Sequence, residues 1–283
     1  MVIFKRSSDL QSYLKTQAGG NIKTGFIPTM GALHKGHVSL LTKARNDGLL
    51  TICSIFVNPT QFNDKSDFDK YPISTDADIA LLTKAGCDIL FLPSVAEVYP
   101  GGPEQVPAYD FGYLDTILEG AKRPGHFRGV GQVVGRLLEI VQPHALYLGQ
   151  KDYQQCMVIS RLKEILGMNS LGIVICPTTR EADGLAMSSR NRRLTDGQRT
   201  LAGLLYQCLV SIQSKQSAAS FSIVRKECFD IMNAKGVTPE YVAIADANDL
   251  TILHEFDPSR PTVALIAARV GDVRLIDNML LRS

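Results

Sequence analysis

The chain has 283 residues, of which 45% are apolar and 20% charged, and its formal net charge is only +2. This length suits one large domain plus a smaller one, and the near-neutral charge argues against a protein that binds nucleic acid. Six cysteines without a C-x-x-C pair are typical of reduced, buried thiols, which favours the cytoplasm. The N-terminus is too short and too quickly charged for a signal peptide, and no apolar run reaches the roughly 20 residues of a membrane span.

The first 176 residues alternate between strand-like and helix-like segments. Apolar residues at positions 130, 133, 134, 137, 138 and 141 follow helical spacing, and Pro143 ends that helix. The expected strands are residues 24–28, 49–57, 88–92, 145–148 and 171–176, and the other expected helices are residues 36–47, 76–85 and 153–167. This alternation predicts a Rossmann-like α/β domain over residues 1–176, with a doubly wound parallel sheet covered by helices on both faces.

From Pro177 onward the pattern changes. A polar, arginine-rich loop runs to about Arg193, and three strand-like runs come at the end of the chain, with Gly271-Asp272 as a hairpin turn. The expected elements are helices over residues 196–214 and 220–235 and strands over residues 241–245, 262–268 and 273–276. Helices followed by strands predict a second, smaller α+β domain over residues 177–283, and the loop at its start fits a mobile lid.

The most informative segment is residues 28–37, PTMGALHKGH, which follows the first long strand and opens a helix. Doubly wound sheets bind ligands at this edge, and a helix N-terminus offers N–H groups to a phosphate. His34 and His37 are three residues apart, so they share one face of the helix start and can stabilise charge that develops in phosphoryl transfer. The alternatives are surface or capping histidines and a zinc site, and the second is disfavoured because no cysteine or carboxylate is adjacent.

Two other strand ends carry polar side chains. Asn58 and Gln61 follow the strand at residues 49–57, and amides suit hydroxyl and carboxylate recognition, although Asn-Pro is also a common turn. Lys151, in the turn GQKDYQQ, can neutralise a polyphosphate as a point charge, and Asp152 can cap a helix or bond a ribose hydroxyl. By itself, the Lys-Asp pair is equally consistent with a solvated helix start.

A fourth segment, GLAMSSRNRR, lies in the loop between the two expected domains. Its Ser-Ser-Arg run, residues 188–190, can hold phosphate groups that are transferred. Considered alone, it is equally consistent with a basic linker.

Taken together, these segments resemble a known family. H-x-G-H after the first strand and a later M-S-S-R segment are similar to the signature pair of the H-x-G-H nucleotidyltransferase superfamily, which includes class I aminoacyl-tRNA synthetases. Five blocks narrow the resemblance to pantothenate synthetases (pantoate–β-alanine ligases): PTMGALHKGH, SIFVNPTQF, LEGAKRPGHFRGV, YLGQKD and DGLAMSSRN. They occur in that family in this order and spacing, and the chain length also fits.

The resemblance implies an ATP-dependent ligase. Pantoate's carboxylate would attack the α-phosphorus of ATP to give pantoyl adenylate and pyrophosphate, and the amine of β-alanine would then give pantothenate and AMP. The family further implies Mg²⁺ bound with the ATP phosphates and a homodimer. The apolar strand at residues 49–57 is a candidate for the dimer surface.

The resemblance and the patterns above give one predicted set of site residues. The catalytic residues are His37, His34 and Lys151. The predicted ATP-binding residues are Met30, Gly31, Ala32, Leu33, His34, Lys35, Gly36, His37, Gly149, Gln150, Lys151, Asp152, Thr179, Met187, Ser188, Ser189 and Arg190. The predicted pantoate and β-alanine residues are Gln61, Gln155, Asn58, Val133 and Val134, of which the two valines match an apolar wall beside pantoate's methyl groups.

The chain departs from the family pattern at residues 71–78. It has Y-P-I-S where the family often has Y-P-R-T, and Ala77 stands where the family often has the first of two successive acidic residues. If that carboxylate helps to hold magnesium, Ala77 cannot. Asp76, Asp78 and water are the candidates that remain, so the metal ligands are unknown.

Two other classes of function stay open. A nucleotidyltransferase that keeps AMP or CMP on its product would use the same H-x-G-H chemistry, whereas a ligase releases AMP. A catalytically silent nucleotide-binding module is the other alternative. The amide pair Gln61 and Gln155 favours the ligase, and the presence of both histidines, Lys151 and the Ser-Ser-Arg run argues against a silent module.

Overall fold

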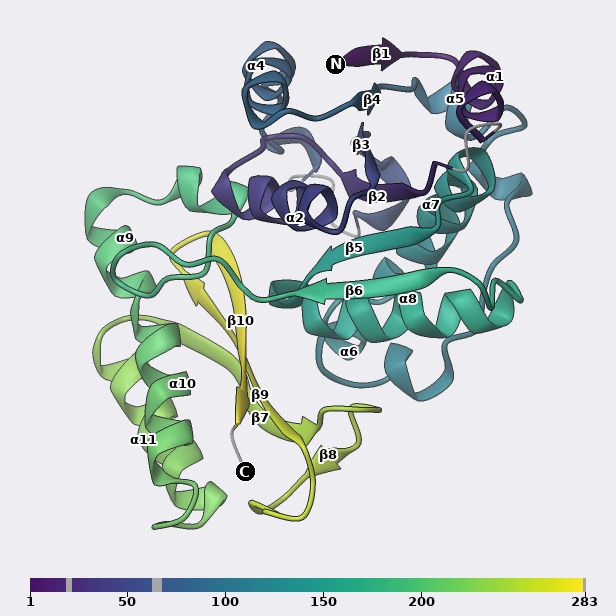
Figure 1. The fold of residues 1–283 in the computed structure, drawn as a ribbon. Coiled ribbons are helices and arrows are strands. Elements are labelled where there is room, and N and C mark those ends of the chain that lie inside the picture. Colours follow the sequence, from purple (N-terminus) through teal and green to yellow (C-terminus); the bar gives the residue numbers. More distant parts are fainter. Residues whose placement is uncertain (19–21, 63–67, 282–283) are drawn as a thin grey trace. The chain divides into compact units, whose positions relative to one another are not determined.

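The computed structural model describes residues 1–18, 22–62 and 68–281. The chain divides into two compact units (Figure 1). Unit 1 contains residues 1–149 and 154–177, and unit 2 contains residues 150–153 and 178–283. The turn at residues 150–153 therefore groups with the C-terminal part of the chain.

Unit 1 is built on a six-stranded sheet in the order β1-β4-β3-β2-β5-β6, and every neighbouring pair is parallel. Its strands are β1 (Val2–Phe4), β2 (Thr24–Thr29), β3 (Leu50–Ile55), β4 (Ile89–Phe91), β5 (Ala145–Gly149) and β6 (Gly172–Cys176). From β2 the chain builds outward through β3 and β4, then returns to add β5 on the other side of β2. The strand order thus reverses between β2 and β5, the position where open α/β sheets bind ligands.

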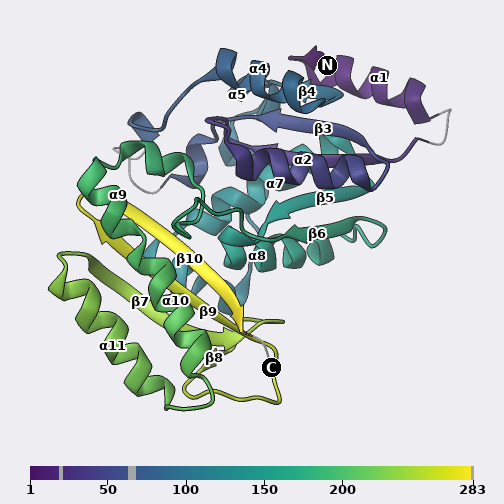
Figure 2. The same ribbon diagram turned by 60° about the vertical axis from the view of Figure 1, so that its left-hand side comes forward.

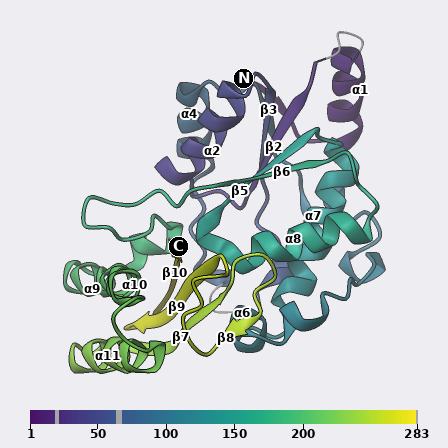
Figure 3. The same ribbon diagram turned by 60° about the horizontal axis from the view of Figure 1, so that its bottom comes forward.

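Helices cover both faces of this sheet. Figure 3 shows α2 (Lys35–Asn46) and α4 (Thr75–Ala85) on one face, and α1 (Ser7–Ala18), α7 (His126–Val141) and α8 (Tyr153–Ile165) on the other. Shorter helices are α5 (Val95–Val98), α6 (Leu118–Lys122) and the 3₁₀ turns η1 (Pro59–Gln61), η2 (Pro103–Gln105) and η3 (Gly112–Asp115). Successive strand residues point to opposite faces, so Phe26 belongs to the core under α7 and Ile27 to the core under α2.

Unit 2 has a four-stranded antiparallel sheet in the order β10-β9-β7-β8, with α10 and α11 running alongside it (Figure 2). Its strands are β7 (Thr238–Asp246), β8 (Ile252–Leu253), β9 (Thr262–Val270) and β10 (Val273–Leu281). Its helices are α9 (Asp196–Ala202), α10 (Leu204–Lys215), α11 (Phe221–Ala234) and the 3₁₀ turns η4 (Gln150–Asp152) and η5 (Ser189–Arg193). One core joins the helices to β7, β9 and β10.

The predicted fold class is confirmed, and most predicted elements lie within two or three residues of the observed ones. Three points differ. The helix expected over residues 196–214 is broken at Gly203, which separates α9 from α10. The strand at residues 49–57 cannot supply a dimer surface, because β3 is paired on both edges and buried. The elements β1, α1, α5, α6 and β8 were not predicted.

The six cysteines are all free and buried, as predicted. Within the described ranges, no helix combines the length and the apolar character that a membrane crossing requires.

Candidate active site

The loop after β2 is held by one buried carboxylate. Asp78, on the first turn of α4, is only 2% exposed. Its Oδ2 accepts the N–H of Ala32 and its Oδ1 the N–H of Leu33, both at 2.8 Å, and Ser74 adds a hydroxyl at 3.1 Å. The loop contains two successive left-handed residues, Gly31 with φ 80° and Ala32 with φ 49°. Because that conformation is unfavourable for alanine, the two bonds to Asp78 fix a loop shape that the local sequence does not favour.

His34 and His37 start α2 as a reciprocal capping box. Nδ1 of His34 accepts the N–H of Gly36 at 3.1 Å, and the N–H of His34 donates to Nδ1 of His37 at 3.3 Å. The two ring centroids are 4.1 Å apart. Since each Nδ1 accepts a hydrogen bond, each neutral imidazole carries its proton on Nε2. The structure therefore brings the two predicted histidines together, with Nε2–H donors at a helix N-terminus.

Asn58 lies behind Gln61. The Asn58 side chain is fully buried, and its Nδ2 donates to Oε1 of Gln61 at 3.3 Å and to the carbonyl of Gly129 at 3.3 Å. Its Oδ1 accepts the Tyr99 hydroxyl at 2.9 Å, and burial raises the pKa of Tyr99, which keeps that donor protonated. Gln61 in turn donates to the Met30 sulfur at 3.1 Å. Through these contacts Asn58 supports the side chain of Gln61. Direct contact between Asn58 and a substrate remains a prediction, and the complete burial of Asn58 argues against it.

Helix α7 packs closely against the η1 turn that carries Gln61. A Cβ added to Gly129 would lie 2.4 Å from the carbonyl oxygen of Thr60, so only glycine fits there. The ring Nδ1 of His126 lies 2.8 Å from the carbonyl oxygen of Gln61. The predicted apolar wall, Val133 and Val134, is on the same helix and buried in the core of unit 1, and Gln155 is half-buried on α8.

A cavity of about 250 Å³ opens beside the loop after β2. It is lined by the ends of β3 and β4 and the start of α4, including Phe56, Ser74 and Asp78. Of the predicted site residues, it touches Met30, Gly31 and Ala32 and neither histidine. It therefore lies next to the predicted ATP-binding loop and does not coincide with the predicted set as a whole.

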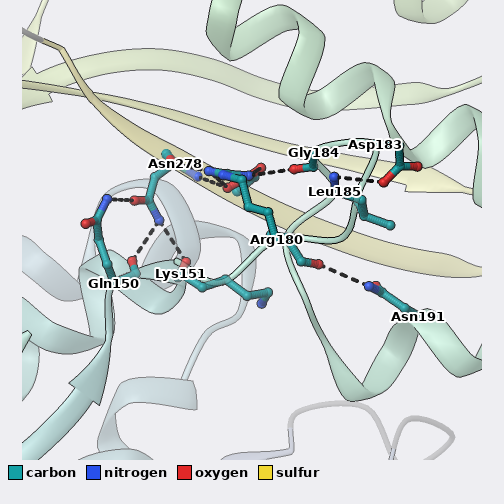
Figure 4. Close-up of polar contacts among 10 residues, drawn as sticks. Gln150, Lys151, Arg180, Asp183, Gly184, Leu185, Asn191 and Asn278 are labelled. Atoms are coloured by element: carbon teal, nitrogen blue, oxygen red, sulfur yellow. Dashed lines mark hydrogen bonds and ion pairs between the residues drawn. The ribbon is translucent and has the colours of Figure 1, made fainter. Parts of the chain in front are cut away.

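In unit 2, the turn that carries Lys151 rests on β10. The Asn278 amide donates to the carbonyl oxygens of Gln150 at 2.9 Å and Lys151 at 2.8 Å, and its Oδ1 accepts Nε2 of Gln150 at 3.1 Å (Figure 4). The Lys151 side chain is 17% exposed, and its ammonium lies 3.6 Å from Asp152. Position 278 is 127 residues from position 151, and nothing in the local sequence pointed to it.

The neighbouring residue, Asp277, anchors another predicted ATP-binding segment of unit 2, the loop between Thr179 and Met187. Arg180 binds its carboxylate through two bonds, at 2.6 and 3.0 Å, and also donates to the carbonyl of Gly184 at 3.0 Å (Figure 4). Burial raises the pKa of Asp277, and the Arg180 guanidinium counters that rise. The N–H of Met187 donates to the carbonyl of Thr179 at 3.0 Å, so these two predicted residues lie side by side. The loop between them is thus closed on itself and anchored to β10.

The segment after Met187 forms the turn η5. Ser188 caps it by accepting the N–H of Arg190 at 3.3 Å, and Ser189 is 7% exposed. The predicted segments of unit 2 are thus held at Asp277 and Asn278 in the middle of β10. In unit 1, the loop with both histidines follows β2, Asn58 and Gln61 follow β3, and Gly149 ends β5, whereas Val133, Val134 and Gln155 lie on helices α7 and α8.

Comparison with known proteins identifies the family. Residues 2–280 match the family model described as pantoate-beta-alanine ligase. The chain belongs to the pantoate–β-alanine ligase family. It is 43% identical over 284 residues to the pantothenate synthetase of Cytophaga hutchinsonii, with 99% of each chain covered, and 44% identical over 262 residues to that of Herpetosiphon aurantiacus, with 92% and 94% covered. The resemblance inferred from the five sequence blocks is therefore confirmed. The prediction that the protein is an enzyme is confirmed with it, because the family is one of ligases.

Solved structures agree with this assignment. The pantothenate synthetase of Thermus thermophilus has a TM-score of 0.90 at 36% identity and covers all of both chains. The pantoate–β-alanine ligase of Francisella tularensis, solved in complex with β-γ ATP and β-alanine, has a TM-score of 0.83 at 37% identity, with 99% of this chain and 97% of that one covered. Both units of the present fold are therefore those of pantoate–β-alanine ligases.

Among the residues that the structure describes, the side chains present do not fit a magnesium site formed by the protein itself. Both oxygens of Asp78 accept backbone N–H groups, Ala77 has no carboxylate, and Asp76 is exposed. Residues 1–18, 22–62 and 68–281 contain no group of three His, Cys, Asp or Glu side chains arranged to hold a metal ion. Asp78 was one of the candidate metal ligands that the sequence left open, and both of its carboxylate oxygens are instead bonded to the loop after β2.

Proposed function

We propose that this chain joins D-pantoate to β-alanine with ATP, giving pantothenate, AMP and pyrophosphate through pantoyl adenylate. The observation that carries the proposal is the pair of histidines that caps α2 at the point where the strand order reverses, on a loop fixed by Asp78. Membership of the pantoate–β-alanine ligase family supplies the substrates.

The first step needs positioning and charge stabilisation. A pantoate carboxylate oxygen attacks the α-phosphorus, a P–O bond forms, and the bond to the β-phosphate oxygen breaks to release pyrophosphate. We propose that the Nε2–H groups of His34 and His37, with the start of α2, hold the phosphate oxygens as their charge increases. Their Nδ1 bonds to the backbone keep those donors in one orientation.

The acid is oriented by unit 1. We assign Gln61 and Gln155 to the hydroxyl and carboxylate groups of pantoate, and Val133 and Val134 to its methyl groups. Support comes from the buried network behind Gln61, in which Asn58 donates to the Gln61 side chain and Tyr99 in turn donates to Asn58. Asn58 is therefore a positioning residue in this proposal.

The second step replaces AMP by an amine. The neutral amine of β-alanine attacks the acyl carbon of pantoyl adenylate, a C–N bond forms, the bond from the acyl carbon to the phosphate oxygen breaks, and the amine loses a proton. AMP is a good leaving group, so the step again needs mainly orientation.

The residues of unit 2 are proposed to serve the nucleotide. Lys151 would neutralise phosphate charge, and Gln150, Asp152, Thr179 and Met187–Arg190 would contact ATP. Gly149, at the end of β5 in unit 1, is proposed as a further ATP contact. Support comes from the bonds that hold Gln150 and Lys151 against Asn278 of β10, and from Arg180, which anchors the loop between Thr179 and Met187 to Asp277 of the same strand. The lid role of this unit is likewise a proposal.

Magnesium, a homodimer and a cytoplasmic location are proposals too. Since the described residues offer no ligand set of their own, we propose that Mg²⁺ comes with ATP as the counter-ion of its phosphates. Light scattering of the purified protein checks the dimer, and a monomer at micromolar concentration contradicts it. The six free, buried cysteines support a reducing compartment.

The function is tested by AMP release with ATP, Mg²⁺ and D-pantoate, with and without β-alanine. We expect steady AMP and pantothenate formation only when acid and amine are both present. Pyrophosphate release without AMP, with an adenylylated product that persists after β-alanine is added, would instead show a nucleotidyltransferase.

A further inference from the structure

Asn278 occupies an unusual position for an amide side chain. It lies on β10, an edge strand of the unit 2 sheet, where one side of the strand has no strand partner among the described residues. Despite this position, Asn278 is only 2% exposed. The η4 turn, residues 150–152, lies against it and removes it from solvent (Figure 4).

The bonds of this amide identify what it holds. Nδ2 has two hydrogens, and it donates one bond to the carbonyl of Gln150 and one to the carbonyl of Lys151. Oδ1 accepts the Gln150 side chain, so the amide uses both of its donors and its acceptor on one turn. A flipped amide would place oxygen against two carbonyl oxygens, so the network allows one orientation only.

We propose that Asn278 is a positioning residue that aims the Lys151 ammonium by fixing the backbone from which its side chain starts. The proposal deepens the function proposed above and rests on it, because it takes Lys151 to be catalytic. A lysine side chain has four flexible carbons, so its main chain is the only rigid reference for the charge. A displacement of about 1 Å at a catalytic group can lower a rate by about 10²-fold.

The adjacent residue extends this role to a second segment. Asp277 binds Arg180, which also donates to the carbonyl of Asn278 at 3.1 Å and stacks on Tyr206 at 4.5 Å. Through Arg180, β10 also anchors the loop that leads to Met187. Residues 277 and 278 therefore fix two predicted anion-binding segments of unit 2, the turn with Lys151 and the loop that leads to Met187, on the same strand.

Asn278→Asp is the sharpest substitution, because the aspartate has the same shape but cannot donate to the two carbonyl groups. Asn233→Asp, at an exposed position on α11, makes the same chemical change as a control. Hydrogen exchange of the peptide covering residues 149–156, without substrates, should become at least about fivefold faster in Asn278→Asp and stay unchanged in the control, since local opening sets the exchange rate. If Asn278→Asp does not fold, Asn278→Ser, which keeps one donor, should show a smaller change.

A kinetic cycle then separates positioning from general stability. In the wild-type background, Asn278→Asp should lower kcat by about 10- to 100-fold while the KM for ATP changes by less than about threefold. In a Lys151→Ala background, the same substitution should lower kcat further by less than about twofold, because the group it aims is absent.

The outcomes are distinct. If the wild type forms pantothenate but Asn278→Asp lowers kcat equally in both backgrounds, Asn278 is only a structural residue and the proposal is overturned while the function stands. Unchanged hydrogen exchange at residues 149–156 also overturns it. A wild type that forms no pantothenate overturns the proposed function, whereas the exchange result still decides whether Asn278 holds the turn.

Discussion

Asp78→Asn tests whether one carboxylate shapes the ATP-binding loop. The amide keeps one oxygen for either Ala32 or Leu33 and turns an NH₂ group toward the other N–H, which is buried and loses its acceptor. A hydrogen bond to a charged group contributes about 1.5–3 kcal/mol, and the surviving bond becomes neutral and weaker. We therefore expect the free energy of unfolding to fall by about 2–3 kcal/mol.

Asp76→Asn is the matched control, because Asp76 is in the same helix turn and exposed. Both substitutions remove a negative charge that interacts favourably with the helix dipole, a contribution of about 0.3–1 kcal/mol. The difference between their free energies of unfolding therefore measures the two hydrogen bonds from Asp78 to the loop. Urea denaturation measures stability, and steady-state kinetics measure the KM for ATP, which should rise by about 10- to 100-fold in Asp78→Asn only, at about 1.4 kcal/mol for each factor of ten.

Equal, small effects of the two substitutions would refute this reasoning, since the loop would then keep its shape without the carboxylate. Restoration of Asp78→Asn activity by excess Mg²⁺ would assign Asp78 to the metal instead.

Three further substitutions test other parts of the structure. His37→Ala should lower turnover by more than ~10²-fold in the AMP-release assay with the fold intact, the scale of a lost transition-state donor, and near-normal turnover would contradict its role. Gly129→Ala places a Cβ 2.4 Å from the carbonyl of Thr60, so urea denaturation should show a loss of about 1–3 kcal/mol and the KM for pantoate should rise; unchanged stability would show that α7 can move aside. The Arg199 guanidinium holds the pKa of Asp183 below its ordinary value of 3.8, so that pair stabilises the fold fully above this pH and loses its effect as pH falls through the folded-state pKa. Asp183→Asn should therefore cost about 0.2–1 kcal/mol near pH 7 and progressively less as the pH falls below 3.8, and a cost that does not change with pH would contradict the ion pair.

The sequence predicted what depends on neighbours in the chain. Apolar spacing located α7, β-branched runs located β3, and the strand–turn–helix context of PTMGALHKGH placed His34 and His37 on one helix start. Each of these features follows from side chains a few residues apart. Local periodicity therefore sufficed for the fold class and for the segments that form the candidate site.

The supports of the site were not predictable in this way. Asp78 accepts hydrogen bonds from the loop after β2, at sequence separations of 46 and 45 residues. Asn278 donates to the turn that carries Lys151, at separations of 128 and 127 residues. A hydrogen bond across such separations leaves no pattern in the intervening sequence. Asp78 drew notice only as a metal candidate, and Asn278 carries no motif. The break between α9 and α10 falls at Gly203, a helix-weakening residue inside a segment whose apolar pattern is otherwise continuous.

The histidine capping box has a practical consequence for making an inactive but intact protein. Because the ring of His34 both starts α2 and is proposed to face phosphate, an alanine there removes a cap worth about 0.5–2 kcal/mol along with the imidazole. Asparagine is a strong cap without an imidazole, so His34→Asn keeps the helix start while it removes the proposed donor. That variant is the one to choose for trapping substrates before turnover, because any change it causes in binding reports the imidazole and not a frayed helix.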